Sequence, residues 1–106
     1  MSLLIDPAAP VWTLLNTVET EPGKQAAVVA CLSAFTEDFA RTLPGFVGTA
    51  VHASRDGTRV VNYVQWRSEA DLRAMLGTAQ ATAHMAEVRA LARSVTPVFY
   101  DVVYGS

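Results

Sequence analysis

Asn62 and Trp66 are the two residues whose types and spacing most directly suggest chemistry. They lie four residues apart in Val60-Val61-Asn62-Tyr63-Val64-Gln65-Trp66, and even spacing places side chains on one face of a strand. The Asn62 amide can donate and accept hydrogen bonds, and the Trp66 indole can donate one. Among aliphatic neighbours they predict a pocket wall with two polar contacts. The competing interpretation is structural, with Asn62 bonded to backbone and Trp66 packed at a strand end.

His84 is a candidate proton acceptor. An ordinary histidine pKa near 6.5 suits removal of a phenolic or carbon-bound proton near neutral pH. His84 shares a helical spacing with Val88 and Leu91, which allows it to face inward. A structural histidine is the alternative.

Cys31 follows Ala27 and Val28 in an apolar helical stretch and is interpreted as a buried helix residue rather than a nucleophile.

The composition fits one soluble domain. The chain has 106 residues, of which 51% are hydrophobic and 17% charged, with a net charge of −2. Scattered lysines and arginines give no basic patch for nucleic acid, and a single cysteine fits a reducing cytoplasm. Residues 1–6 contain no basic residue, so we expect neither a signal peptide nor a membrane span. No metal site is expected, because cysteine pairs and paired-histidine spacings are absent from the sequence.

Hydrophobic periodicity and turn residues predict six main elements in the order β-α-β-β-α-β. Pro44-Gly45 should end the first helix, Asp56-Gly57 should turn a hairpin, and Ser68 should cap the second helical region, which Gly77 interrupts. The expected elements are a strand over 11–18, a helix over 25–43, strands over 46–54 and 58–66, helices from 69 and over 79–94, and a strand over 95–104.

This order predicts an α+β, ferredoxin-like fold, in which two helices cover one face of a four-stranded antiparallel sheet. A two-residue loop at Asp56-Gly57 would place Val51 opposite Asn62 and His52 opposite Val61 on the reverse face. Residues such as Val61, Tyr63 and Phe99 make an uncovered second face unfavourable. We therefore expect a partner's sheet to cover it, giving a homodimeric α+β barrel.

One long phrase of the sequence resembles a known family. It runs from Pro44-Gly45-Phe46 through His52-Ala53-Ser54-Arg55-Asp56-Gly57-Thr58 to Val60-Val61-Asn62-Tyr63-Val64-Gln65-Trp66, and Ser68-Glu69 follows. The phrase resembles the antibiotic biosynthesis monooxygenases, in particular those that convert anthrone intermediates of aromatic polyketide pathways into quinones. The resemblance implies a domain over 11–106, after an extension over 1–10. It also implies a small aromatic substrate and oxygenation with dioxygen as co-substrate and no cofactor.

The resemblance also implies roles for individual residues. Asn62 and Trp66 would hydrogen-bond the substrate carbonyl or enolate in a site between sheet and helices. Leu72 stands where such enzymes can have a tyrosine, and Ala86 stands near an expected arginine, so the helical side departs from the family pattern. His84 is the suggested catalytic substitute on that side. The other expected substrate-binding residues are Asn16, Leu72, Arg73, Met75 and Arg89.

Two alternatives stay open. A related branch with the same barrel degrades haem with an asparagine on the first strand and a histidine on the last helix, and Asn16 and His84 occupy comparable places. Met75, however, stands near that branch's functional tryptophan. The other alternative is a non-catalytic small-molecule-binding barrel, since a fold alone does not establish chemistry.

Overall fold

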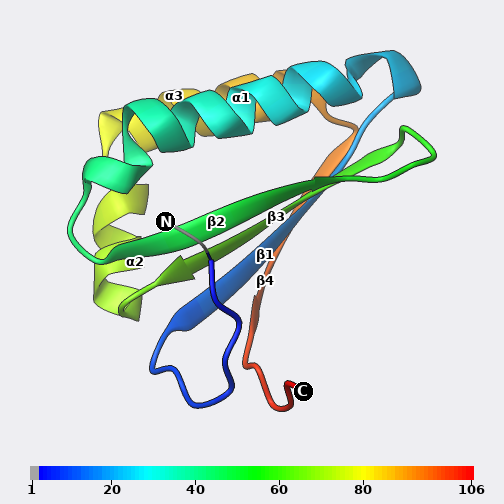
Figure 1. The fold of residues 1–106 in the computed structure, drawn as a ribbon. Coiled ribbons are helices and arrows are strands. Elements are labelled where there is room, and N and C mark those ends of the chain that lie inside the picture. Colours follow the sequence, from blue (N-terminus) through cyan, green and yellow to red (C-terminus); the bar gives the residue numbers. More distant parts are fainter. Residues whose placement is uncertain (1–2) are drawn as a thin grey trace.

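A four-stranded antiparallel sheet lies beneath two side-by-side helices, with a third helix at one end (Figure 1). The computed structural model describes residues 3–106. The strand order is β2-β3-β1-β4, which confirms the ferredoxin-like fold. The elements are β1 (Trp12–Glu19), η1 (Pro22–Lys24), α1 (Gln25–Asp38), η2 (Ala40–Thr42), β2 (Phe46–Ala53), β3 (Arg59–Trp66), α2 (Glu69–Leu76), α3 (Ala79–Leu91) and β4 (Ser94–Tyr100).

The strand register decides which side chains face the helices. Val51 lies opposite Asn62, and His52 lies opposite Val61, as predicted. On the other side of β3, Asn16 of β1 lies opposite Asn62. Because side chains alternate between the two faces, Asn16 and Asn62 share the face beneath the helices, which we call the inner face. His52 lies on the other, outer face and is exposed.

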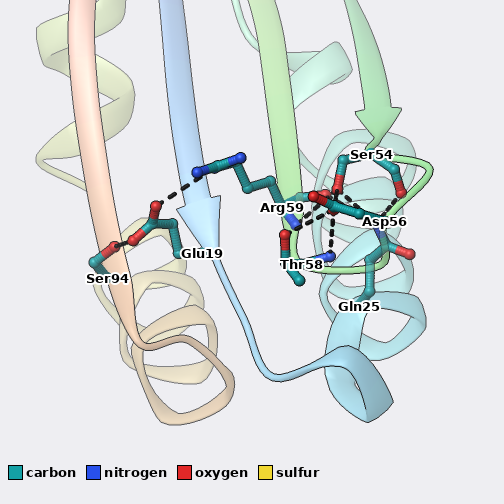
Figure 2. A network of polar contacts seen from close by, with 7 residues as sticks. All are labelled: Glu19, Gln25, Ser54, Asp56, Thr58, Arg59 and Ser94. Carbon is teal, nitrogen blue, oxygen red and sulfur yellow. Dashed lines mark hydrogen bonds and ion pairs between the residues drawn. The ribbon is translucent and has the colours of Figure 1, made fainter.

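The β2–β3 register is fixed by a well-bonded turn (Figure 2). Asp56 Oδ1 accepts hydrogen bonds from the Thr58 backbone N–H at 3.0 Å and from the Thr58 and Ser54 hydroxyls, each at 2.7 Å. The Thr58 and Ser54 side-chain bonds are the main reason that the Asp56 pKa falls to about 2. Gly57 has a φ of +80°, a conformation that glycine adopts without a Cβ clash. These contacts explain why the Asp-Gly pair predicted the pairing correctly.

A second set of bonds ties this turn to α1 and to the other strands (Figure 2). Gln25 Nε2, at the start of α1, donates to the carbonyls of Ser54 at 2.8 Å and Arg59 at 2.9 Å. Arg59 Nε lies 3.4 Å from Glu19 Oε1, and the Ser94 hydroxyl donates to Glu19 Oε2 at 3.0 Å. One end of the sheet is thus fixed to the helix above it.

The apolar core consists of two clusters beneath the helices. The larger contains Val18, Val28, Leu32, Val60 and Val88. The smaller contains Val64, Trp66 and Leu72. Val28 and Leu32 are the two buried residues of α1. Within residues 3–106, no helix is both long and apolar enough to cross a membrane.

Four predicted boundaries or placements were wrong. The third helix ends at Leu91 and not at Ser94, because Ala92 has an extended backbone with φ −107° and ψ 152°, and β4 begins at Ser94. The first helix ends at Asp38 because Phe39, with φ −140° and ψ −63°, leaves helical geometry, and η2 follows. The last strand ends at Tyr100, which pairs with Thr13 near the start of β1, so the residues after it have no strand partner in this sheet. Phe99 lies opposite Leu14 on the inner face, not on the outer face with Val61.

The N-terminal segment contacts the outer side of the sheet. Gln65 Nε2 donates to the Leu4 carbonyl at 2.8 Å, and the Leu3 side chain lies against Gly48. Met1 and Ser2 of the predicted extension lie outside the described residues. The domain boundary after residue 10 stays a prediction.

Candidate functional site

A cavity of about 350 Å³ lies between the inner face and the helices. This volume is at the lower end of the range of small-molecule pockets. The sheet and the helices both contribute side chains, most of them apolar. From the strands these include Leu14, Asn16, Phe46, Asn62, Val64, Trp66 and Phe99, and from the helices Leu32, Phe35, Leu72, Met75, His84 and Arg89.

Trp66 supplies a buried hydrogen-bond donor to the cavity wall. Its side chain is 1% exposed and packs edge-on against Phe46, with ring centroids 5.5 Å apart. Among the described residues, Trp66 Nε1 has no hydrogen-bond partner. A buried donor without a partner costs on the order of 1–3 kcal/mol. A ligand oxygen in the cavity would remove that cost.

Asn16 and Asn62 supply a pair of amides about 13 Å along the strand direction from Trp66, given a rise of about 3.3 Å per residue. Asn16 Oδ1 is buried and has no partner within residues 3–106. Asn62 Oδ1 accepts a hydrogen bond from the Thr49 hydroxyl at 2.5 Å. The cavity therefore has polar groups at two separate places on a largely apolar wall.

His84 faces the same cavity from α3. Its ring stacks on Phe35, with centroids 4.0 Å apart and planes 5° apart. Nδ1 lies 3.7 Å from Cys31 Sγ, which donates to Glu87 Oε2 at 3.4 Å. Burial lowers the His84 pKa below 6.5, and the Glu87 charge opposes this to a smaller extent. The imidazole is therefore neutral, and able to accept a proton, at neutral pH.

Cys31 is half-buried on α1, whereas a buried helix residue was expected. Burial, and after it the hydrogen bond and charge of Glu87, raise the Cys31 pKa to about 11. The thiol is consequently protonated at neutral pH, which makes it a poor nucleophile.

The other predicted substrate-binding residues fall into two groups. Leu72, Met75 and Arg89 line the cavity. Arg73 does not: its side chain is 72% exposed and pairs with Glu69 at 2.8 Å. The structure thus brings together all the predicted site residues except Arg73.

Thr49 is a site neighbour that the sequence analysis missed. The predicted pairing of Val51 with Asn62 was a signal for it, because Thr49 is two residues before Val51 and so lies on the same face. The bulge between Phe46 and Gly48 instead brings Phe46 to the inner face, and Gly48 is a residue type that often marks a bulge. For residues 3–106, no group of three or more His, Cys, Asp or Glu residues could hold a metal ion.

Comparison with known proteins identifies the family. The model of the antibiotic biosynthesis monooxygenase family matches residues 12–87. The chain is 42% identical over 100 residues to the tetracenomycin-F1 monooxygenase of Streptomyces glaucescens, covering 94% of this chain and 88% of that protein.

Solved structures have the same fold. The monooxygenase from the gene ActVA-Orf6 of Streptomyces coelicolor, in complex with nanaomycin D, is 30% identical with a TM-score of 0.73, covering 95% of this chain and 93% of that one. SnoaB, a cofactor-independent oxygenase from Streptomyces nogalater, is 23% identical with a TM-score of 0.73, covering 92% and 97%. The matched residues include β1, β2, β3 and most of the helical wall, but not β4 or Arg89. The chain belongs to the antibiotic biosynthesis monooxygenase family and is therefore classed as a monooxygenase.

Proposed function

We propose that this protein is a cofactor-independent monooxygenase that oxidises an electron-rich polycyclic phenol or anthrone to a quinone with dioxygen. The observation that carries the proposal is the buried, unpartnered indole N–H of Trp66 on the wall of a largely apolar cavity that Asn62 also lines. An apolar cavity suits fused aromatic rings, and the polar groups suit oxygens at their edge.

The reaction needs little from the protein beyond binding, proton removal and charge stabilisation. For an anthrone, the overall change is anthrone plus dioxygen to anthraquinone plus water. His84 takes the proton that leaves the substrate, and the electron-rich anion transfers an electron to dioxygen. The resulting radical and superoxide combine to form the carbon–oxygen bond, and the peroxide takes the proton back from His84. Loss of water from this hydroperoxide, which breaks the O–O bond and the remaining C–H bond at that carbon, gives the quinone. Trp66 and Asn62 donate hydrogen bonds to different oxygens of the anion, over which its negative charge is delocalised. The apolar lining keeps water away from these interactions.

Arg89 supports the same chemistry from the rim of the cavity. It lines the cavity and has no ion-pair partner among residues 3–106. Its guanidinium is always charged, so it is available to an anionic substrate. Arg73, already paired with Glu69, is not used in this proposal.

The named relatives favour this substrate class. One is described as acting on tetracenomycin F1, one was solved with nanaomycin D, and SnoaB is described as cofactor-independent. We extend these properties to the present chain as a proposal. An intracellular location, as expected from the single cysteine, is part of the same proposal.

We further propose that the protein acts as a homodimer through the outer face of the sheet. Leu15, Val61 and Tyr63 lie half-buried on this face, and Val98 and Tyr100 are 40% and 52% exposed. A second sheet on this face would remove their apolar surface from water. Size-exclusion chromatography with light scattering tests this: a monomer at micromolar concentration would contradict it.

The activity is tested by measuring oxygen uptake with a dihydroxyanthrone and no added cofactor. The wild type should exceed the enzyme-free rate, and Asn62→Ala and Trp66→Phe should each be slower. Unchanged rates in both variants would overturn the proposed site. Ligand binding without oxygen uptake would instead indicate a binding protein.

The haem alternative is favoured by one observation, since Asn16 and His84 line the same cavity. A haem titration separates the two enzymes. A change in the Soret band that is lost in His84→Ala would favour haem over a phenolic substrate, and no change in the wild type would remove the haem alternative.

A further inference from the structure

Thr49 lies on the inner face beside Asn62. The β2–β3 register pairs Val51 with Asn62 and Thr49 with Val64, so Thr49, two residues before Val51, shares their face. The bulge lies beyond this point, between Phe46 and Gly48, and brings Phe46 to the inner face opposite Trp66.

The Thr49 hydroxyl contacts Asn62 from outside the cavity. Thr49 is not part of the cavity wall; together with Thr36 and Arg41 it borders a separate hollow of about 390 Å³. Its Oγ1 lies 2.5 Å from Asn62 Oδ1 and 3.0 Å from the Tyr63 carbonyl. Thr49 can therefore act on a bound substrate only through Asn62.

The direction of this hydrogen bond decides what Asn62 offers the substrate. Two oxygens 2.5 Å apart need a proton between them, and the hydroxyl carries the proton that can fill this place. With Oδ1 engaged by Thr49, the Nδ2 group is the part of the amide left for a ligand. A donor stabilises an anionic oxygen, whereas an exposed Oδ1 would repel it.

We infer that Thr49 is a positioning residue that holds the Asn62 amide with Nδ2 available to the cavity, so that Asn62 donates to the substrate oxyanion. The inference rests on the proposed function, because it concerns an anionic intermediate at that site. Without the hydroxyl, the amide is free to turn its oxygen towards the ligand.

The direct test is a spectrophotometric pH titration of bound alizarin, a dihydroxyanthraquinone whose colour changes when a phenol ionises. In the wild type, the pKa of the bound phenol should be lower than that of the free dye. Thr49→Val should raise that pKa by about one unit, which corresponds to a tenfold weaker preference for the anion. Thr49→Ser, which keeps the hydroxyl, should restore the wild-type value.

Turnover provides a second readout. Thr49→Val should lower kcat for a dihydroxyanthrone by about tenfold with little change in KM, since the bond matters mainly once charge develops. Thr49→Ala should behave in the same way and replaces Thr49→Val if the latter does not fold. Thr82→Val, at an exposed position of α3 that does not line the cavity, is the matched control and should match the wild type.

Four results would overturn the inference: a wild-type pKa at or above that of the free dye, no shift in the Val and Ala variants, a Ser variant as impaired as Val, or no binding of alizarin. If the pKa of bound alizarin depends on Thr49 but the anthrone is not oxidised, the positioning role is supported and only the proposed function is contradicted. If the anthrone is oxidised at the same rate with and without the Thr49 hydroxyl, only the positioning role is contradicted.

Discussion

Asn16 and Asn62 lie directly opposite each other on β1 and β3, and both side chains line the cavity. Their situations differ, because Asn62 Oδ1 is bonded to Thr49 whereas Asn16 Oδ1 is buried without a partner in residues 3–106. Such an unpaired group lowers the free energy of unfolding. A phenolic hydroxyl of the ligand that donates to Asn16 Oδ1 would explain why a polar side chain occupies this buried position.

Replacing Asn16 should therefore stabilise the fold while weakening substrate binding. Asn16→Leu removes the unpaired amide and adds apolar volume, so the free energy of unfolding should rise by about 1 kcal/mol. The KM for a phenolic substrate should increase. Urea denaturation and steady-state kinetics measure the two effects, and a destabilised variant with an unchanged KM would show that Asn16 is purely structural.

Trp66→Phe should lower kcat by roughly tenfold to a hundredfold, because a hydrogen bond to a charged oxygen contributes about 1.5–3 kcal/mol. The measurement is oxygen uptake with a dihydroxyanthrone at saturating substrate. Trp12→Phe is the matched control, since Trp12 is 40% exposed and packs against Phe99 without lining the cavity. Equal losses in the two variants would contradict the specific role of Trp66.

The low pKa of His84 predicts the acidic limb of the pH profile. As a base, His84 must be unprotonated, so kcat/KM should fall as the pH drops through a value below 6.5. His84→Gln should remove this limb and lower the rate by roughly a hundredfold or more. His52→Gln, at an exposed position on the outer face, should leave the profile unchanged. An acidic limb that persists in His84→Gln would identify another base.

The lowered pKa of His84 also makes the free energy of unfolding depend on pH. Below pH 6.5 the unfolded chain binds a proton at His84 more readily than the folded chain does. Unfolding is therefore favoured as the pH falls below this value. Chemical denaturation of the wild type and His84→Gln between pH 5 and 7.5 should show a smaller pH dependence in the variant.

The fold was predictable because local signals agreed with each other. Asp56-Gly57 turns the hairpin, and Ser68 caps α2 by accepting from the Asp71 N–H. Pro44-Gly45 lies between η2 and β2, although α1 itself ends earlier, at Asp38. The hairpin turn also gave the correct pairing of Val51 with Asn62. With the register known, the alternation of strand residues placed Asn62 and Trp66 on one wall.

What could not be predicted depends on tertiary contacts. The predicted Val51–Asn62 pairing places Thr49 on the inner face, but the hydrogen bond between the Thr49 hydroxyl and Asn62 depends on side-chain geometry that the sequence does not show. The helical spacing did not distinguish Arg73 from Arg89. In the structure Arg73 pairs with Glu69, and of these two arginines only Arg89 lines the cavity. Phe99 was placed on the wrong face because the sequence does not show how the last strand pairs with β1. In the structure Phe99 pairs with Leu14, which sets the face on which it lies.

Gly45, directly before β2, should not tolerate a side chain. Its φ is +85°, and a Cβ there would overlap the Asp71 side chain. Gly45→Ala should therefore lower the free energy of unfolding by at least about 1–3 kcal/mol. Gly23→Ala is the control, because nothing lies within 4 Å of a Cβ at that position. Thermal denaturation of both variants measures the difference, and equal melting temperatures would contradict the strain argument.

The central claim, that the cavity wall formed by Asn62 and Trp66 performs a monooxygenation, is tested most directly with isotopically labelled dioxygen. Purified protein, a dihydroxyanthrone and a metal chelator are combined, and the product is analysed by mass spectrometry. The wild type should form a quinone with one labelled oxygen atom well above the enzyme-free rate, and the Asn62→Ala/Trp66→Phe double variant should form little more than the background. Label incorporation at the same rate in the double variant, or at the enzyme-free rate in the wild type, would contradict the account.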